Sequence, residues 1–276
     1  MPITKSERIA ISKVVNKRPR YAKSTRNRGS VAIIGKSRPK VSKGLKKKIQ
    51  SVIDSNNENK QAYQSVTNVN YNSGILNSAD CNYLIPNISN STSDNGRIGD
   101  QIKCIRLNIK GHMITNLSST SYSNVRLCVR MMIVQPKQYN SKSAVDANAT
   151  TWMGALLRKG GTVTSFTGVV SDLYAPINSD LITTYYDKLF YVKCPYVPGV
   201  TDGAWPTSQS TKFFNINLRV KNKIMKYDST ESGGLLPTNY CPTLILGYSK
   251  LDSGAPDTVS TNINLSWIST LDFQDS

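Results

Sequence analysis

The sequence predicts an all-β fold: a single two-sheet sandwich of eight strands that follows a disordered basic N-terminal arm. Three observations lead to this prediction. Beyond the first fifty residues, apolar side chains come in short runs with β-branched or aromatic alternation. Turn-forming residues such as Asn95-Gly96, Pro136 and Pro195 separate these runs. The positive charge is concentrated at one end of the chain.

The charge divides the chain into an arm and a body. Residues 1–50 contain sixteen Lys and Arg residues and one acid, Glu7, so they carry +15 of the net charge of +18. The remaining 226 residues carry +3, from nineteen basic and sixteen acidic side chains. Such an arm can neutralise a polyanion, while a nearly neutral body folds and associates with copies of itself. Residues 1–40 bury too little apolar area to offset their ordering entropy, so we expect disorder in isolation.

A short helix is predicted over 41–54, with Ser42 as its N-cap. Apolar residues recur there at i, i+4, i+7 and i+8, namely Leu45, Ile49, Val52 and Ile53. Two interpretations stay open: the apolar face docks on the chain's own body, or helices from several subunits bundle beneath a shared axis. We therefore divide the chain into the arm (1–40), a short amphipathic helix and linker (41–60) and the β domain (61–276).

The β domain is long enough for one large sandwich. Its eight predicted strands are Tyr63–Tyr71, Gln101–Ile114, Asn124–Gln135, Val163–Val170, Tyr185–Lys193, Lys212–Lys221, Thr243–Lys250 and Ser260–Phe273. A helical interruption is expected around Ala144–Leu157. Eight strands with long, uneven connections suggest a jelly roll, which is one form of the two-sheet sandwich.

Alternation along the strands predicts which side chains face away from the core. In the third predicted strand, Arg126 and Arg130 share the face opposite the apolar residues. The core face of the sixth strand comprises Phe214, Ile216, Leu218 and Val220. Arg219 and Lys221 occupy its other face. If the third and sixth strands are neighbours, these four cations form one basic surface; the alternative is that they are ordinary solvated charges. Arg106 and Lys110 in the second strand likewise point away from the core.

The sequence lacks the residue patterns of common catalytic sites. The only histidine, His112, excludes His-based triads and multi-His metal sites. Gly35-Lys36-Ser37 resembles the end of a P-loop, but Ser30 stands where that motif needs Gly. The acids are scattered without the spacing of a metal cage, although some could converge at a subunit contact to hold calcium. We therefore predict neither an enzyme nor a cofactor.

The cysteines and the apolar runs bear on the compartment. The five cysteines, Cys81, Cys104, Cys128, Cys194 and Cys241, are odd in number and widely spaced, which favours structural thiols in a reducing compartment. No apolar run approaches the length of a membrane span, and charged residues interrupt the N-terminus where a secretory signal needs an apolar core. We expect a chain made in the cytosol without membrane insertion.

The arm predicts nucleic-acid binding. Flexible Lys and Arg side chains bind phosphates by releasing counterions and do not read bases. Tyr21 is the only aromatic residue among the first fifty, so a base-stacking platform in the arm is not expected. Lys17–Arg20 and Lys46–Lys48 also have the composition of nuclear import signals. The predicted binding residues are Arg126, Arg130, Arg219 and Lys221 of the body together with Lys5, Arg8, Lys13, Lys17, Arg18, Arg20, Lys23, Arg26, Arg28, Lys36, Arg38, Lys40, Lys43, Lys46, Lys47 and Lys48.

Several segments resemble a known family when taken in order. The run from Gly96 to Gly111 is similar to the R-x-G-D-x-I motif and alternating strand of capsid proteins of small circular Rep-encoding single-stranded DNA viruses, and satellite tobacco necrosis virus-like capsids show a related pattern. Further similarities are Tyr186–Tyr191, Phe214–Lys221 with Tyr227-Asp228, Thr243–Tyr248 and the basic arm.

The resemblance implies a single jelly roll, about sixty copies of which close a T=1-like icosahedral shell with the arm inside. It further implies packaging of a single-stranded DNA genome, and a virion assembled in the host nucleus. The arm is Lys-rich with apolar islands, whereas circovirus arms are almost pure Arg, which leaves open a relation to RNA-packaging satellite capsids. Two other classes stay open: a non-assembling nucleic-acid-binding β protein, and an enzyme or lectin with an incidental basic tail. The sequence does not identify a host receptor.

Overall fold

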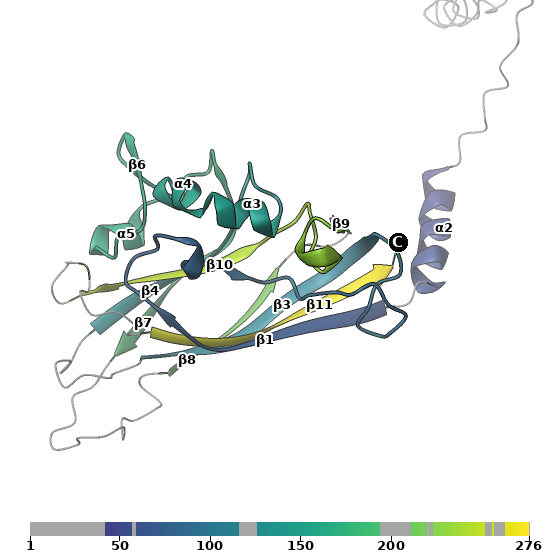
Figure 1. Cartoon of the computed structure of the whole chain (residues 1–276), viewed down its shortest axis with the longest axis horizontal. Coiled ribbons are helices and arrows are strands. Elements are labelled where there is room, and N and C mark those ends of the chain that lie inside the picture. The colour runs from purple at the N-terminus through teal and green to yellow at the C-terminus, as the bar shows by residue number, and fades with distance from the viewer. Residues whose placement is uncertain are drawn as a thin grey trace, which may run out of the picture. The chain divides into compact units, whose positions relative to one another are not determined.

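The computed structural model describes residues 42–56, 59–115, 126–193, 211–218, 220, 223–251, 256 and 263–275. The chain divides into two units between Val52 and Ile53. The described part of the second unit consists mostly of antiparallel β-sheet, as the sequence predicts (Figure 1).

Helix α2 (Lys43–Asn56) confirms the predicted helix and its cap. The Oγ of Ser42 accepts a hydrogen bond from the backbone N–H of Leu45 at 3.2 Å. Leu45, Ile49 and Val52 are 50%, 48% and 60% exposed, so this apolar stripe is not part of a core. What packs against it stays a prediction.

The first sheet has the strand order β1-β11-β3-β8, with all neighbours antiparallel. Its strands are β1 (Asn59–Tyr71), β11 (Ile263–Asp275), β3 (Gln101–Thr115) and β8 (Thr211–Leu218). A short strand, β9 (Lys223–Lys226), also pairs with β3. All four long strands overlap predicted ones.

The second sheet has the order β2-β10-β4-β7 and is also antiparallel. Its strands are β2 (Asn82–Tyr83), β10 (Thr243–Lys250), β4 (Arg126–Pro136) and β7 (Ile182–Lys193). The bounds of β10 agree with the prediction. The chain crosses between the two sheets at most of its connections, so most consecutive strands lie in different sheets.

The main apolar core lies between the two sheets. Alternate residues of β3, β4, β8 and β11 supply most of it, which confirms the predicted core face of Phe214, Ile216, Leu218 and Val220. Burial of these side chains is the main driving force for sandwich formation. Gly111 of β3 faces this core between its register partners Phe214 and Trp267. A Cβ at Gly111 would lie 2.3 Å from the carbonyl oxygen of Ser266, so only glycine fits there.

A layer of short elements covers the outer face of the second sheet (Figure 1). Between β4 and β7 the chain forms α3 (Lys142–Ala147), α4 (Ala149–Gly154), β5 (Leu157–Lys159), β6 (Thr162–Thr164) and α5 (Val170–Tyr174). Their apolar side chains pack on the outward residues of β4 and β10 as a second cluster, which includes Cys128, Met132, Val134, Trp152, Met153, Phe166 and Ile245. One face of the sandwich is therefore closed by protein.

Two predictions for this layer need correction. The helix expected over Ala144–Leu157 is two helices, because Asn148 between them has non-helical dihedral angles (φ −111°, ψ 17°). The strand expected over Val163–Val170 is wrong beyond Thr164, and the chain turns into α5. Gly168 has a φ of +91°, which ends the extended conformation. It also lies so close to Ser73 that an added Cβ would be 2.9 Å from the Cβ of Ser73.

Candidate nucleic-acid interface

Most of the predicted cations lie outside the described residues. These are the twelve arm side chains from Lys5 to Lys40, together with Arg219 and Lys221. Four lysines on α2, namely Lys43, Lys46, Lys47 and Lys48, are exposed. This spacing places cations around a helix rather than on one face, which suits contact with a flexible polyanion.

The basic surface predicted from Arg126 and Arg130 is wrong as a surface. Alternation places the two on one face of β4, and Arg126 is exposed at the start of the strand. However, β4 lies between β10 and β7 in the second sheet, whereas β8 pairs with β3 in the first. The adjacency that would have joined the third and sixth predicted strands does not occur.

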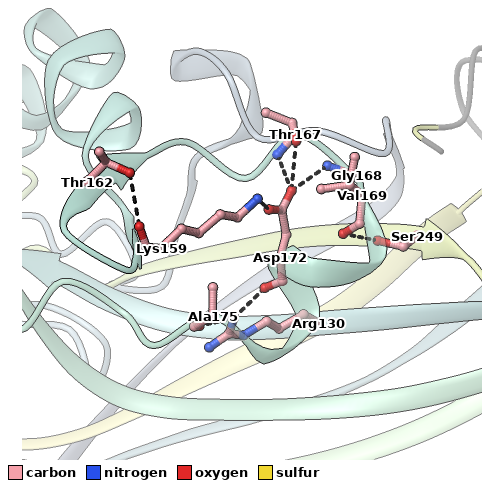
Figure 2. Close-up of polar contacts among 9 residues, drawn as sticks. All are labelled: Arg130, Lys159, Thr162, Thr167, Gly168, Val169, Asp172, Ala175 and Ser249. Atoms are coloured by element: carbon pink, nitrogen blue, oxygen red, sulfur yellow. Dashed lines mark hydrogen bonds and ion pairs between the residues drawn. The ribbon is translucent and has the colours of Figure 1, made fainter. Parts of the chain in front are cut away.

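Arg130 is a buried structural residue, only 4% exposed. Its Nε and Nη2 donate to the two carboxylate oxygens of Asp187 at 2.9 and 2.6 Å. Its Nη1 donates to the carbonyl oxygens of Asp172 and Ala175, both at 2.7 Å (Figure 2). The guanidinium therefore ties β4 to β7 and to the end of α5, and it is not accessible to phosphate.

Asp172 of α5 also holds the covering layer in place and is fully buried. Its Oδ2 accepts hydrogen bonds from the N–H and Oγ1 of Thr167, at 2.7 and 2.9 Å, and from the N–H of Gly168 at 3.0 Å. Its other oxygen forms an ion pair with Lys159 of β5 (Figure 2). Ser249 of β10 donates to the carbonyl of Val169 at 3.0 Å. These contacts hold α5 and the β5–β6 hairpin on the second sheet.

The Arg97–Asp100 motif also has a structural role. Arg97 is 4% exposed, and its Nη2 donates to the carbonyl of Gly234 at 3.0 Å, in the 3₁₀ turn η2 (Ser232–Gly234). Its guanidinium lies 4.7 Å from the ring centre of Tyr227. Gly99 takes a positive φ of 91°. The motif therefore fixes the chain just before β3 begins.

The outer face of the first sheet is the uncovered polar surface of the described sandwich. It carries a hollow of about 590 Å³, lined by Gln61, Arg106, Asn108, Lys110, Asn215, Asn217, Ile268 and Thr270. All four long strands contribute, so the hollow depends on the strand order. Arg106 and Lys110 confirm the prediction that they point away from the core. The sequence did not predict that these two cations share a hollow with residues of β1, β8 and β11, because it did not place β3 between β11 and β8.

The two cations of this hollow differ in availability. Arg106, whose side chain is 54% exposed, binds Asp272 through Nε at 2.8 Å and Nη2 at 2.7 Å, and Gln61 donates to the same carboxylate at 2.8 Å. Lys110 has no ion-pair partner among the described residues. Asn108 donates to Asn215 at 3.0 Å across the strands. The face thus offers an available ammonium group among amide donors and acceptors, which suits phosphate and sugar contacts.

Three further features of the described residues concern metal ligands, the single histidine and the helices. No three His, Cys, Asp or Glu side chains among them are grouped as metal ligands. His112 is partly buried beside Phe213, with ring centres 5.8 Å apart. In the described ranges, no helix is both long and apolar enough to span a bilayer. The absence of a cofactor and of enzymatic activity stays a prediction.

The described cysteines behave as structural thiols, as predicted. Cys81, Cys104, Cys128 and Cys241 are free and buried, and Cys194 lies outside the described residues. Burial raises the pKa of Cys104 and of Cys241 to about 12 and that of Cys128 to about 11. These thiols stay protonated near neutral pH and are weak nucleophiles.

Comparison with known protein families finds no matching family, and comparison with curated proteins finds no similar sequence.

Proposed function

We propose that this chain is a viral capsid protein that assembles into a small icosahedral shell and packages single-stranded DNA through its basic arm. The observation that carries the proposal is the pairing of a +15 arm with a sandwich whose two sheets have the strand orders β1-β11-β3-β8 and β2-β10-β4-β7.

The strand order supports a jelly roll. In that fold the chain builds two facing antiparallel four-stranded sheets through Greek-key connections. Setting aside β9 and the β5–β6 hairpin, the chain enters the sheets in the order first, second, first, second, second, first, second, first. The first and last of these strands, β1 and β11, pair with each other. This winding is expected of a single eight-stranded jelly roll.

The charge distribution supports packaging from one side. About sixty arms of +15 each would place roughly 900 positive charges inside a shell, comparable with a genome on the order of one to two thousand phosphates. In the sequence, the arm and α2 precede β1, an edge strand of the first sheet. The outer face of that sheet is polar and carries Arg106 and Lys110, whereas the opposite face of the sandwich is closed by α3–α5. We therefore assign the first sheet to the genome side.

Exposed apolar side chains away from this face support contacts between copies. Leu76, Ile98, Val163 and Tyr191 are each at least half exposed. Closing a shell requires several extensive interfaces per subunit. Scattered apolar residues on the loops, the covering layer and β7 fit such contacts.

Negative-stain electron microscopy of the purified full-length chain tests the proposal. We expect closed particles of uniform diameter that hold nucleic acid. Monomers alone, across salt and pH and with or without added nucleic acid, would instead favour a non-assembling nucleic-acid-binding protein. The nucleic acid extracted from particles, digested separately with DNase and RNase, distinguishes a DNA genome from the RNA of a satellite-type capsid.

A further inference from the structure

Two aromatic side chains stand out on the polar face of the first sheet. Phe213 of β8 is 79% exposed and Tyr63 of β1 is 71% exposed, the highest values among the large apolar side chains of the described residues. Both lie on the uncovered outer face, one on each edge strand. Single exposed apolar side chains are common on protein surfaces, so the groups around these two rings decide what they can contact.

The strand register places polar groups between these rings. Phe213 pairs with His112, and Tyr63 pairs with Thr270, which is opposite Asn108. Lys110 occupies the row between His112 and Asn108. With about 3.4 Å per residue and about 4.8 Å between strands, the two rings are about 20 Å apart across the sheet. They are too far apart to enclose one base, but they can hold separate bases of one strand.

Two hollows share part of their lining on this face, although neither ring lines them and Tyr63 lines a separate hollow with Tyr83 and Ile85. A second hollow of about 210 Å³ includes Lys110, His112 and Ile268 in its lining, and it shares Lys110 and Ile268 with the larger hollow. His112 lies against Phe213 at 5.8 Å and 47°, which widens the aromatic surface on that side. Together the lining of the two hollows extends from β8 to β1 and includes the available ammonium group of Lys110.

The chemistry of this lining fits an unpaired strand. Bases of a duplex stack on one another and present only their edges, whereas bases of a single strand can be splayed out onto aromatic rings. Lys110 supplies a phosphate contact, and the asparagine side chains supply donors and acceptors for sugars and base edges. The residues that line the two hollows are mostly polar, which favours a charged ligand that forms hydrogen bonds.

We propose that the outer face of the first sheet binds single-stranded nucleic acid by stacking bases on Phe213 and Tyr63 around a phosphate held by Lys110. This inference rests on the proposed packaging function and names the form of nucleic acid that the body itself selects. The arm binds any polyanion, and this face adds a preference for unpaired bases.

Fluorescence anisotropy with the full-length chain tests the inference. The probes are an oligo(dT) strand, an abasic strand of the same length and a duplex, each titrated over a series of salt concentrations. The variants are Phe213→Ala, Phe213→Trp and Lys110→Gln. Tyr174→Ala is the matched control, because Tyr174 is 65% exposed on α5, in the layer over the second sheet.

We expect Phe213→Ala to weaken oligo(dT) binding roughly 5- to 100-fold without changing the dependence of affinity on salt. Binding of the abasic strand should not change, Phe213→Trp should restore affinity, and Tyr174→Ala should have no effect. Lys110→Gln should reduce the slope of log affinity against log salt by about 1. Wild-type affinity of Phe213→Ala for oligo(dT), or an equal loss on the abasic strand, overturns the inference.

The same variants separate this inference from the proposed function. If Phe213→Ala binds oligo(dT) normally but the wild-type chain forms particles that protect nucleic acid, stacking is wrong and packaging stands. If the wild-type chain forms no particles but shows the base-dependent effect, the capsid proposal is wrong and the single-strand site stands. Because Phe213 is so exposed, its truncation should leave the thermal unfolding of the body unchanged, which circular dichroism checks.

Discussion

Replacing Arg130 by Met separates a structural role for this residue from a role in nucleic-acid binding. The substitution keeps most of the side-chain volume and removes the four hydrogen bonds to Asp187, Asp172 and Ala175. Removing one partner of a buried ion pair typically costs about 3–5 kcal/mol. The side chain of Asp187 is 32% exposed and regains some hydration, so we expect about 3 kcal/mol.

Urea denaturation of the unassembled full-length chain measures this loss. Trp152 of α4, in the covering layer, packs into the second apolar cluster, so its fluorescence reports on that layer. With a slope of about 2 kcal/mol per molar urea, the midpoint should fall by about 1.5 M. Arg126→Met, on the same face of β4 but exposed, is the control and should cost at most about 1 kcal/mol.

The binding readout completes the test of Arg130. Phosphate affinity of folded Arg130→Met should match that of the wild type, because the guanidinium is enclosed. An unchanged urea midpoint together with weaker binding to an oligonucleotide would refute the burial argument and restore the basic surface that the sequence suggested.

Three further predictions concern packing and ionisation. Gly111→Ala should lower the free energy of unfolding by about 3 kcal/mol or prevent folding, because its Cβ would overlap a backbone carbonyl; a urea midpoint within error of the wild type would contradict this. Cys104 and Cys241 should resist iodoacetamide at pH 8 until urea is added, as measured by peptide mass mapping, and fast labelling of the native chain would argue against burial. Because their pKa values are raised, the stability that the protonated thiols contribute should be lost as pH rises from about 9 towards 12. Burial raises the pKa of Glu231, but hydrogen bonds from serines including Ser143 outweigh burial, so the net pKa is lowered. Glu231→Gln should therefore destabilise the chain at pH 7, by an amount that shrinks as pH falls below 4.5. A destabilisation that does not depend on pH would exclude this linkage.

Strand positions were largely predictable because they depend on local pattern. Thr243–Lys250 was recognised from its β-branched and apolar residues, and alternation assigned Phe214 and Ile216 to the core. The short strands β2, β5 and β9 were missed, because a few residues with no pattern of their own become strands only through pairing with a distant partner.

The candidate site was less predictable, because it depends on strand order. Alternation showed that Arg130 and Lys110 both point away from the main core, but it does not show whether another layer covers that side. Arg130 is enclosed by the insertion between β4 and β7, whereas Lys110 is open. Phe213 was read as part of a strand, and only the register with His112 places it on the same face as Lys110.

Nuclease protection tests whether the arm holds the genome while the sandwich forms the shell. The full-length chain and a chain lacking residues 1–40 are purified from the same host, treated with nuclease and assayed for surviving nucleic acid. We expect resistant nucleic acid with the full-length chain and almost none with the truncated chain, whose circular dichroism should still show a folded β domain. Equal protection by the two chains would contradict this division of roles.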